Sequence, residues 1–196
     1  MNDSGSMDGG LRRCRLLHAV VGLSALICFF RPAISAGADE PVLAEYRVKA
    51  LFLLNFSKYV EWPAGTLADT NAPFVIGIVG QDRFEDHLEE AVKGKAIDGH
   101  PFVIAHLADN DDFSRCRILF VSNSEGERTA AVLARAARLP VLTVGEDHTF
   151  GSNGGMIDMV IKDRCIRLQI NVVAANRCGL KISSKLLAVA DTVRLR

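Results

Sequence analysis

Apolar runs alternate with short polar segments along the chain and predict a series of strands and helices. Phe74 to Val79 is an apolar run closed by Gly80, which indicates a buried strand followed by a turn. Ile118 to Val121 and Val141 to Val144 repeat this pattern, and a shorter strand is expected from Pro101 to Ala105. Strands that alternate with helical segments are typical of a mostly parallel sheet covered by helices.

The segments around these strands have helical spacing. Ala44 to Val60 has too few polar positions for a fully solvated face, so it predicts a largely buried helix, which Trp62-Pro63 ends. Asp82 precedes apolar residues at helical spacing and is expected to cap a helix, and Ser122, Asn123 and Ser124 offer caps for the next one. A last helix, from 183 or 184 to 193, is expected to close the core.

The carboxyl-terminal part predicts a β-hairpin. Met156 to Ile161 follows a turn at Asn153 to Gly155, and the segment 162–164 offers a second turn before a strand from Cys165 to Ile170. The predicted fold is therefore α/β: a single three-layer domain with a mixed, mostly parallel sheet and a late antiparallel hairpin.

The first 38 residues have the layout of a secretory signal peptide. A segment with three arginines precedes an apolar run from Leu16 to Phe30, and small residues follow up to Ala38, after which cleavage is expected. The apolar run is shorter than the roughly 20 residues that a membrane anchor needs. We therefore expect an exported protein that does not span a membrane after cleavage. The alternatives that remain open are a start at Met7 and cleavage after Ser35 or Ala36.

Charge and length limit what the mature part, 39–196, can be. The whole chain has 23 basic and 23 acidic side chains, and removal of the leader takes away more basic than acidic ones. The slightly acidic remainder lacks the basic surface that nucleic acid requires. Its length is that of one domain with a substantial core.

Three cysteines remain after cleavage, which is an odd number for an oxidising compartment. Cys165 and Cys178 are the better candidates for a disulfide, since one starts the second hairpin strand and the other precedes the returning segment at Gly179. Cys116 starts an apolar strand and can equally be a small buried residue. None of the three has the spacing of a metal site.

Other candidate chemistry is weak, so neither a catalytic residue nor a cofactor is predicted. Gly77 and Gly80 lack the third glycine and the acidic residue of a dinucleotide site. The acidic run from Asp109 to Asp112 lacks the glycine and glutamate of a calcium loop. His148 is the one histidine considered for a site, and the serines lack a nucleophile elbow, which disfavours a hydrolase.

Two blocks of the sequence resemble the YfiR-like family. The first is KALFLLNFSKYVEWP at 49–63, and the second runs from Gly154-Gly155-Met156-Ile157 through Asn171 to GLKISSKLL at 179–187. Val79-Gly80 and the strand that starts at Cys116 lie between them in the expected order. The resemblance covers nearly the whole mature chain.

The resemblance implies a function without catalysis. It implies a periplasmic regulator, usually dimeric, that binds the periplasmic sensor part of an inner-membrane diguanylate cyclase and holds it inactive. An OmpA-like outer-membrane lipoprotein removes it from that partner, and cyclic di-GMP and biofilm formation change as a result. Disulfides brace the better-known members, which have an even number of cysteines, so redox control cannot be carried over to a chain that retains three.

The candidate partner-binding residues are Trp62, Ile166, Leu168 and Ile170. The last three alternate with polar residues along a hairpin strand, which is the pattern of a sheet with one dry face that can dock a partner. Ordinary core contacts are the competing interpretation. Trp62, at a helix end, can equally be a core lid or an interface anchor.

A second functional class is a periplasmic sensory domain that binds a small molecule. Open α/β sheets bind ligands at the carboxyl ends of their strands, here the loops after Gly80, Ser122 and Gly145. The two functions are compatible with each other. The sequence leaves open whether a homodimer would form through the first helix or through the hairpin.

Overall fold

The computed structural model describes residues 39–67, 69 and 71–195. The predicted signal peptide, 1–38, and its cut after Ala38 lie outside the described residues. The helices are α1 (Asp39–Tyr59), α2 (His87–Val92), α3 (Thr129–Ala136), α4 (Val172–Arg177) and α5 (Ser184–Leu187), with a 3₁₀ helix η1 (Asn123–Arg128). The strands are β1 (Val60–Glu61), β2 (Phe74–Val79), β3 (Ala96–Ile97), β4 (His100–Leu107), β5 (Cys116–Val121), β6 (Leu142–Gly145), β7 (Ile157–Lys162), β8 (Cys165–Asn171), β9 (Lys181–Ile182) and β10 (Thr192–Arg194).

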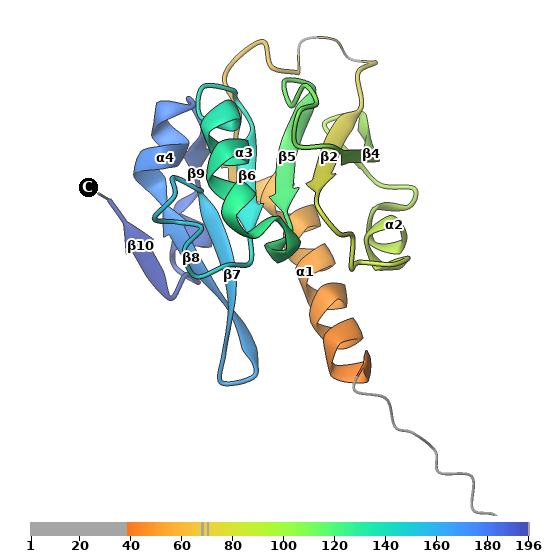
Figure 1. Cartoon of the computed structure of the whole chain (residues 1–196). Coiled ribbons are helices and arrows are strands. Elements are labelled where there is room, and N and C mark those ends of the chain that lie inside the picture. The colour runs from red at the N-terminus through yellow and green to blue at the C-terminus, as the bar shows by residue number, and fades with distance from the viewer. Residues whose placement is uncertain (1–38, 68, 70, 196) are drawn as a thin grey trace, which may run out of the picture. The chain divides into compact units, whose positions relative to one another are not determined.

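An eight-stranded sheet in the order β10-β8-β7-β6-β5-β2-β4-β3 is the centre of the fold (Figure 1). The pairings from β4 to β7 are all parallel, and β8 runs antiparallel to β7. A separate pair, β1 and β9, joins the end of α1 to the segment before α5. The predicted α/β class, with its mostly parallel sheet and late hairpin, is confirmed.

Two apolar cores lie on the two faces of the sheet. The larger core packs α1 and α2 against residues such as Ile76, Phe120 and Ile157, and aromatic contacts join the layers where Phe84 meets Phe120 at 4.8 Å between ring centroids. The smaller core packs α3 against the other face. Figure 1 shows α3 in front of the sheet and α1 behind it. The central strands are apolar on both sides because both of their faces are covered.

The loop between β6 and β7 is held in place by Phe150, which is almost wholly buried. Its ring lies against Gly145 on one side and Gly155 on the other. A Cβ atom on either glycine would overlap the ring. The two glycines are therefore required by the close approach of an aromatic side chain.

The predicted last helix is wrong in its length. Helix α5 ends at Leu187, and the chain then turns so that the Asp191 amide donates to the Leu168 carbonyl, at 2.9 Å. Residues Thr192–Arg194 continue beside β8 as a parallel edge strand. Pairing with the free edge of β8 satisfies backbone groups that a longer helix would leave unpaired on that strand.

Asp82 does not cap α2, because that helix begins at His87. The Asp82 carboxylate instead accepts from the Phe84 amide at 2.7 Å and lies 2.6 Å from Nε2 of His106. Asp82 thus closes a turn before the helix.

Candidate functional site

Two elements extend beyond the carboxyl edge of the parallel strands. Strand β6 ends at Gly145, opposite Asp158 near the start of β7, and the β7–β8 hairpin continues past that level. The amino-terminal half of α1 extends in the same direction (Figure 1). An apolar groove of about 690 Å³ lies between them. We call it the helix–hairpin groove; its lining residues are Ala44, Glu45, Val48, Phe52, Ile161, Arg164, Cys165 and Ile166.

The groove exposes aliphatic side chains that the core does not use. Val48 on α1 is 43% exposed and Ile161 on β7 is 45% exposed, and Phe52 and Ile166 are half-buried beside them. Helix α1 has apolar side chains outside the face that packs on the core. Leu53 is fully buried on that face, whereas Leu51 is exposed. Large aliphatic groups gathered at one exposed site are typical of interaction surfaces.

A buried polar cluster ties α1 to the loop after β6 and touches the groove through Glu45. The Lys49 ammonium group lies 2.5 Å from the Glu146 carboxylate and also contacts Glu45. Tyr46 donates its hydroxyl to Glu146 at 2.9 Å, and the Asn123 amide donates to it at 3.0 Å. The side chains of Lys49 and Glu146 are 3% and 1% exposed, so their charges are almost fully withdrawn from water. Burial, followed by the charge of Glu146, raises the pKa of Tyr46 well above its ordinary value.

Asp158 lies next to this cluster without a partner. The residue is 1% exposed, and neither carboxyl oxygen has a hydrogen-bond partner among the described residues. The pKa of Asp158 is raised to about 7, chiefly by burial and next by the charge of Asp147; the charge of Lys49 lowers it and that of Glu146 raises it. Asp158 is therefore a buried carboxyl group, close to the Lys49–Glu146 pair, whose charge depends on pH near neutrality.

The predicted partner-binding residues do not lie together. Ile166 lines the groove, but Leu168 and Ile170 point into the core and are each 2% exposed. Trp62 lies at the amino ends of the central strands β2 and β5, where its indole donates to the Arg117 carbonyl at 3.3 Å and its ring packs edge-on against Phe74. Of the four, only Ile166 belongs to the groove.

The predicted disulfide between Cys165 and Cys178 is not formed. Cys165 is exposed at the hairpin turn, whereas Cys178 is buried behind α4 and donates its thiol to the Ala137 carbonyl at 3.2 Å. Strand β8 and helix α4 separate them, and the strand alone spans about 20 Å. A disulfide needs Cα atoms within about 7 Å. Cys116 is also a free, buried thiol.

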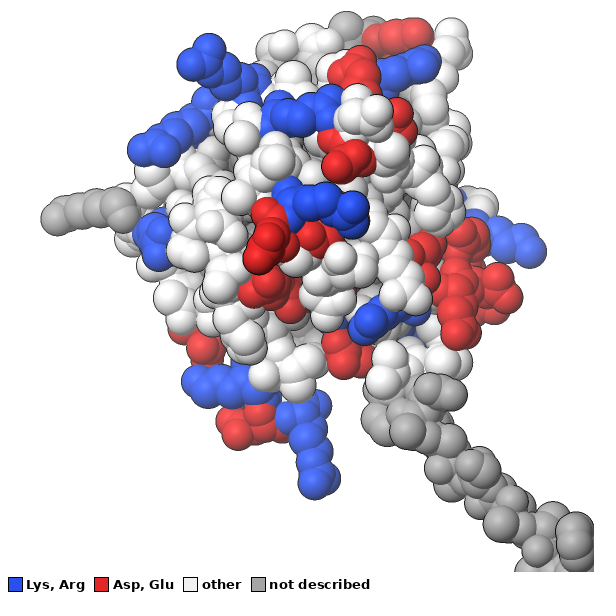
Figure 2. Space-filling view, viewed as in Figure 1, with Lys and Arg blue, Asp and Glu red and all other residues white. Residues whose placement is uncertain are grey.

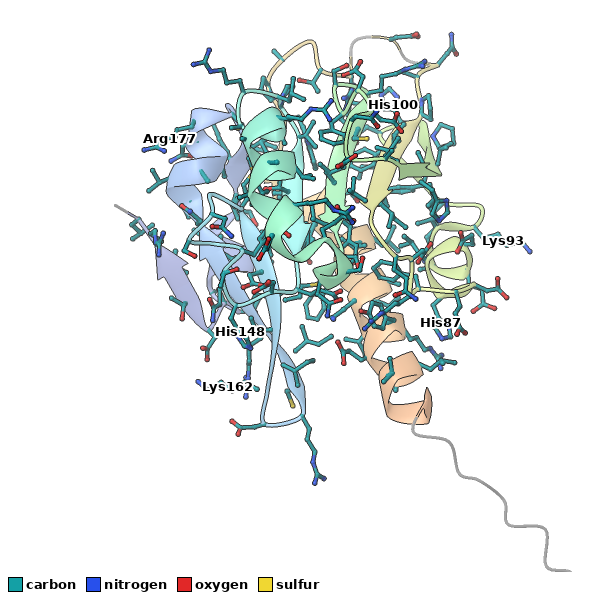
Figure 3. All side chains as sticks on the ribbon, in the orientation of Figure 1. His87, Lys93, His100, His148, Lys162 and Arg177 are labelled. Carbon is teal, nitrogen blue, oxygen red and sulfur yellow. The ribbon has the colours of Figure 1, made fainter. Side chains whose placement is uncertain are left out.

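The three loops considered for a small molecule do meet, but their polar groups bond to one another. The Gln81 amide donates to Ser124 Oγ at 2.8 Å, and the Asn123 amide donates to Glu146. Gly80 packs directly against Ser124 and Glu125. His148 is exposed in the third of these loops, the one after Gly145 (Figure 3). The loops are therefore held together by their own hydrogen bonds, and a cavity of about 280 Å³ remains beside them, lined by residues that include Gly80, Leu107 and Glu125.

The sequence contained one indication of the groove, the shortage of polar positions in α1. That shortage was interpreted as burial, whereas Val48 and Leu51 are exposed. The ion pair of Lys49 with Glu146 joins residues 97 positions apart, and nothing in the local pattern of either residue indicates the other.

Basic and acidic side chains are interspersed on the face shown in Figure 2. Both kinds are also found at the turn of the hairpin. The rim of the groove follows this pattern, with Glu45 on the helix side and Arg164 on the hairpin side. The apolar centre is thus bordered by one acidic and one basic residue.

The YfiR/HmsC-like family model matches residues 46–191, a span that contains α1, the sheet and the hairpin. The chain belongs to the YfiR/HmsC-like family. This is a regulatory and generally non-catalytic family of the periplasm, associated with cyclic di-GMP signalling. The family model thus covers both walls of the groove except for Ala44 and Glu45.

A solved structure has a similar fold. It is a conserved domain protein from Vibrio cholerae O1 biovar El Tor str. N16961, with 12% sequence identity and a TM-score of 0.56. The similarity covers 76% of this chain and 60% of that one, so this chain spans less than two thirds of the solved protein. No curated protein matches the sequence. Within 39–195, apart from the two undescribed positions, none of the helices has the length and apolarity to cross a membrane.

Proposed function

We propose that this chain is an exported periplasmic regulator that binds the periplasmic sensor region of an inner-membrane diguanylate cyclase and represses it without catalysis. Export would follow cleavage after Ala38. Membership of the YfiR/HmsC-like family supports this class of function. The observation that carries the proposal is the helix–hairpin groove, an exposed apolar surface between two elements that project from the sheet.

The groove has the composition of an interface centre. Val48, Phe52, Ile161 and Ile166 supply an apolar middle, which a partner can desolvate with a bulky aliphatic or aromatic side chain. A specific interface buries about 800 Å² per partner, so contacts must extend from the groove onto the surrounding polar surface. Interfaces commonly combine such an apolar centre with a polar rim.

In this proposal, binding through the groove represses the cyclase because it is linked to the cyclase's own conformational equilibrium. A regulator that binds only the inactive conformation of the cyclase sensor shifts the cyclase toward that conformation. We further propose that an OmpA-like outer-membrane lipoprotein relieves repression by competing for the regulator, and that the regulator acts as a homodimer. Cyclic di-GMP then rises because the cyclase is released, although the regulator never contacts the nucleotide.

A charge in the groove tests the proposal. Ile161→Glu should abolish co-purification with the isolated periplasmic domain of the cyclase and should raise cellular cyclic di-GMP to the level of a gene deletion. Desolvating a carboxylate at the centre of an interface costs several kcal/mol, which is more than a transient interface can lose.

A matched control separates this effect from general damage. Val103→Glu places the same charge at a side chain that is 44% exposed on β4, outside the groove, and should leave binding intact. Circular dichroism establishes that both variants are folded. Unchanged cyclase binding by folded Ile161→Glu and Val48→Glu proteins would refute the groove as the docking site, and an unchanged cyclic di-GMP level in the deletion strain would refute repression.

A further inference from the structure

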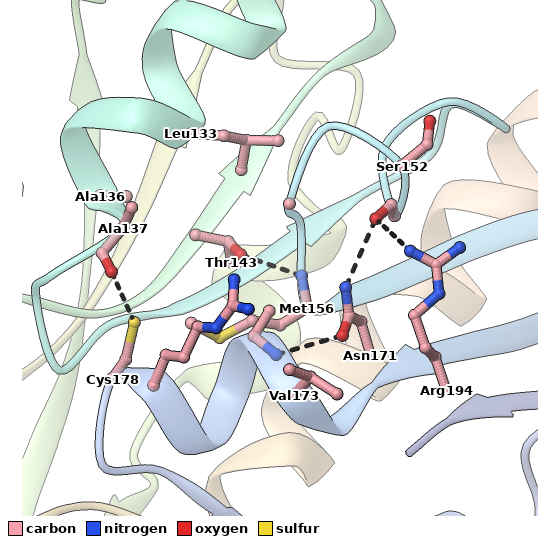
Figure 4. A pocket seen from close by; sticks show the side chains of 14 residues that line it. Leu133, Ala136, Ala137, Thr143, Ser152, Met156, Asn171, Val173, Cys178 and Arg194 are labelled. Atoms are coloured by element: carbon pink, nitrogen blue, oxygen red, sulfur yellow. Dashed lines mark hydrogen bonds between the residues drawn. The ribbon is translucent and has the colours of Figure 1, made fainter. Parts of the chain in front are cut away.

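A second cavity lies on the opposite side of the fold from α1, between α3, α4 and the loop that precedes β7 (Figure 4). It has a volume of about 330 Å³, near the lower end of the range for small-molecule sites. Leu133 and Val173 supply part of an apolar wall, and Figure 4 shows Thr143, Asn171 and Arg194 on the other sides. The cavity is separate from the helix–hairpin groove and shares no lining residue with it.

The side chains deep in this cavity have unused hydrogen-bond donors. Thr143 is 2% exposed, and its hydroxyl accepts from the Met156 amide at 3.1 Å, which leaves the hydroxyl proton available to donate. The Asn171 side-chain oxygen accepts from the Ala174 amide at 3.1 Å, and its amide nitrogen makes a single long bond of 3.4 Å to the Gly151 carbonyl. One amide proton of Asn171 is therefore free for a ligand.

Two arginines add positive charge to the same cavity. Arg177 comes from the last turn of α4 and Arg194 from β10, and neither forms an ion pair with a carboxylate within the described part of the chain. Arg194 makes one long contact, 3.5 Å, to the Gly151 carbonyl. The residues lining the cavity include no aspartate or glutamate. The cavity thus combines guanidinium groups and free donors without a negative charge.

We propose that this cavity binds a small organic anion whose carboxylate or phosphate group is held by Arg177 and Arg194. Guanidinium groups bind both kinds of anion through pairs of parallel hydrogen bonds. Thr143 and Asn171 supply further donors to the bound oxygens, and the wall at Leu133 and Val173 contacts a short aliphatic body. Asn171 and Arg194 can leave the Gly151 carbonyl at small cost because both bonds are long, and that carbonyl keeps its bond from the Gly154 amide.

The inference is independent of the proposed function, and binding measurements on the purified protein test it. Succinate and inorganic phosphate serve as the carboxylate and phosphate probes, titrated at constant ionic strength while the melting temperature and the backbone amide NMR spectrum are followed. A saturable rise in melting temperature is expected with one or both probes. The shifted amides should lie in 151–154 and in α4. Succinamide, a neutral analogue of succinate, should have no effect.

Variants assign the binding to the cavity. Arg177→Gln and Arg194→Gln each remove a charge from an exposed side chain and should weaken binding at least tenfold. Arg115→Gln removes an exposed arginine outside the cavity and should bind as the wild type does. The inference is overturned if neither probe binds, if succinamide acts as succinate does, or if both cavity variants keep wild-type affinity. Ile161→Glu should retain anion binding, so failure of either proposal is recognised separately.

Discussion

Asp158 makes the stability of the protein depend on pH near neutrality. Its pKa is raised to about 7, chiefly by burial, whereas in the unfolded chain the carboxyl group has the ordinary value of 3.8. Between pH 3.8 and about pH 7, Asp158 is protonated in the folded state and ionised in the unfolded state. The stabilisation is therefore fully present below about pH 4 and is lost as the pH rises through 7, at up to about 1.4 kcal/mol per pH unit.

Asp158→Asn should remove that dependence. The neutral amide has nothing to ionise, so urea unfolding between pH 5 and 8 should show a flatter profile than the wild type and a gain on the order of 1–3 kcal/mol at pH 8. Asp109→Asn changes an exposed carboxyl group and should follow the wild-type profile. Parallel profiles for Asp158→Asn and the wild type would contradict a raised pKa at this position.

Lys49 should be among the most sensitive polar positions of α1. Lys49→Met leaves the Glu146 carboxylate buried without its cation, and breaking a buried ion pair on one side costs about 3–5 kcal/mol. Lys58→Met, an exposed lysine on the same helix, should change the free energy of unfolding by less than about 0.5 kcal/mol. The double variant Lys49→Met with Glu146→Gln should recover part of the loss, and a strictly additive result would show that the pair is not coupled.

At the scale of elements, the hairpin turn stores backbone strain. Asp163 and Arg164 both have positive φ, at 53° and 60°, in the two-residue turn that joins β7 and β8. This conformation costs residues with side chains about 1–2 kcal/mol each, and least for Asp and Asn. The double change Asp163→Asn and Arg164→Gly should stabilise the protein by about 0.5–1 kcal/mol in urea unfolding. Arg115→Gly, at a residue without positive φ, should destabilise the protein. If the double variant also destabilises the protein, the strain assigned to the hairpin turn is contradicted.

The elements that were predicted correctly are those with a strong local signal. Strand β2 has the predicted bounds, Phe74–Val79, because a buried apolar run ends at a glycine with positive φ. Helix α4 was not predicted, since its six residues show no long apolar stripe. Strands β3 and β10 are too short to leave a pattern, and pairing with a neighbouring strand creates them.

The same distinction applies to the candidate site. The alternation of Ile166, Leu168 and Ile170 identified a strand with one dry face, but it did not show which of these residues the core would cover. That outcome depends on α1, more than 100 positions earlier, which packs over Leu168 and Ile170 and leaves Ile166 at the groove. The cavity with the two arginines is assembled by five separate segments and has no signal in any one of them.

For the whole molecule, the three cysteines of the described part should differ widely in reactivity. Cys165 is exposed, whereas burial raises the pKa of Cys116 to about 11 and also raises that of Cys178. The thiolate is the reactive form, so iodoacetamide should label Cys165 first in the folded chain starting at Asp39, and the other two only in urea. Peptide mapping by mass spectrometry gives the order. Recovery of a peptide that links Cys165 to Cys178 would contradict their separation.

The groove and the cavity with the two arginines give the molecule two surfaces of different chemistry. One is aliphatic and suited to a protein partner, and the other is cationic and suited to a small anion. The predicted homodimer and the predicted lipoprotein partner remain predictions at this scale. Trp62 lies at the amino ends of β2 and β5 and lines neither the groove nor the cavity.

Phe150 and its two glycines limit how sequences with this fold can diverge. Because the ring occupies the space of a Cβ atom at both Gly145 and Gly155, neither glycine can be replaced alone without displacing the ring, and the loop at 151–154 would move with it. A homologue with a larger residue at either glycine should therefore carry a smaller one in place of the phenylalanine. The three positions are expected to co-vary as a unit, which an alignment of relatives would reveal as a linked substitution.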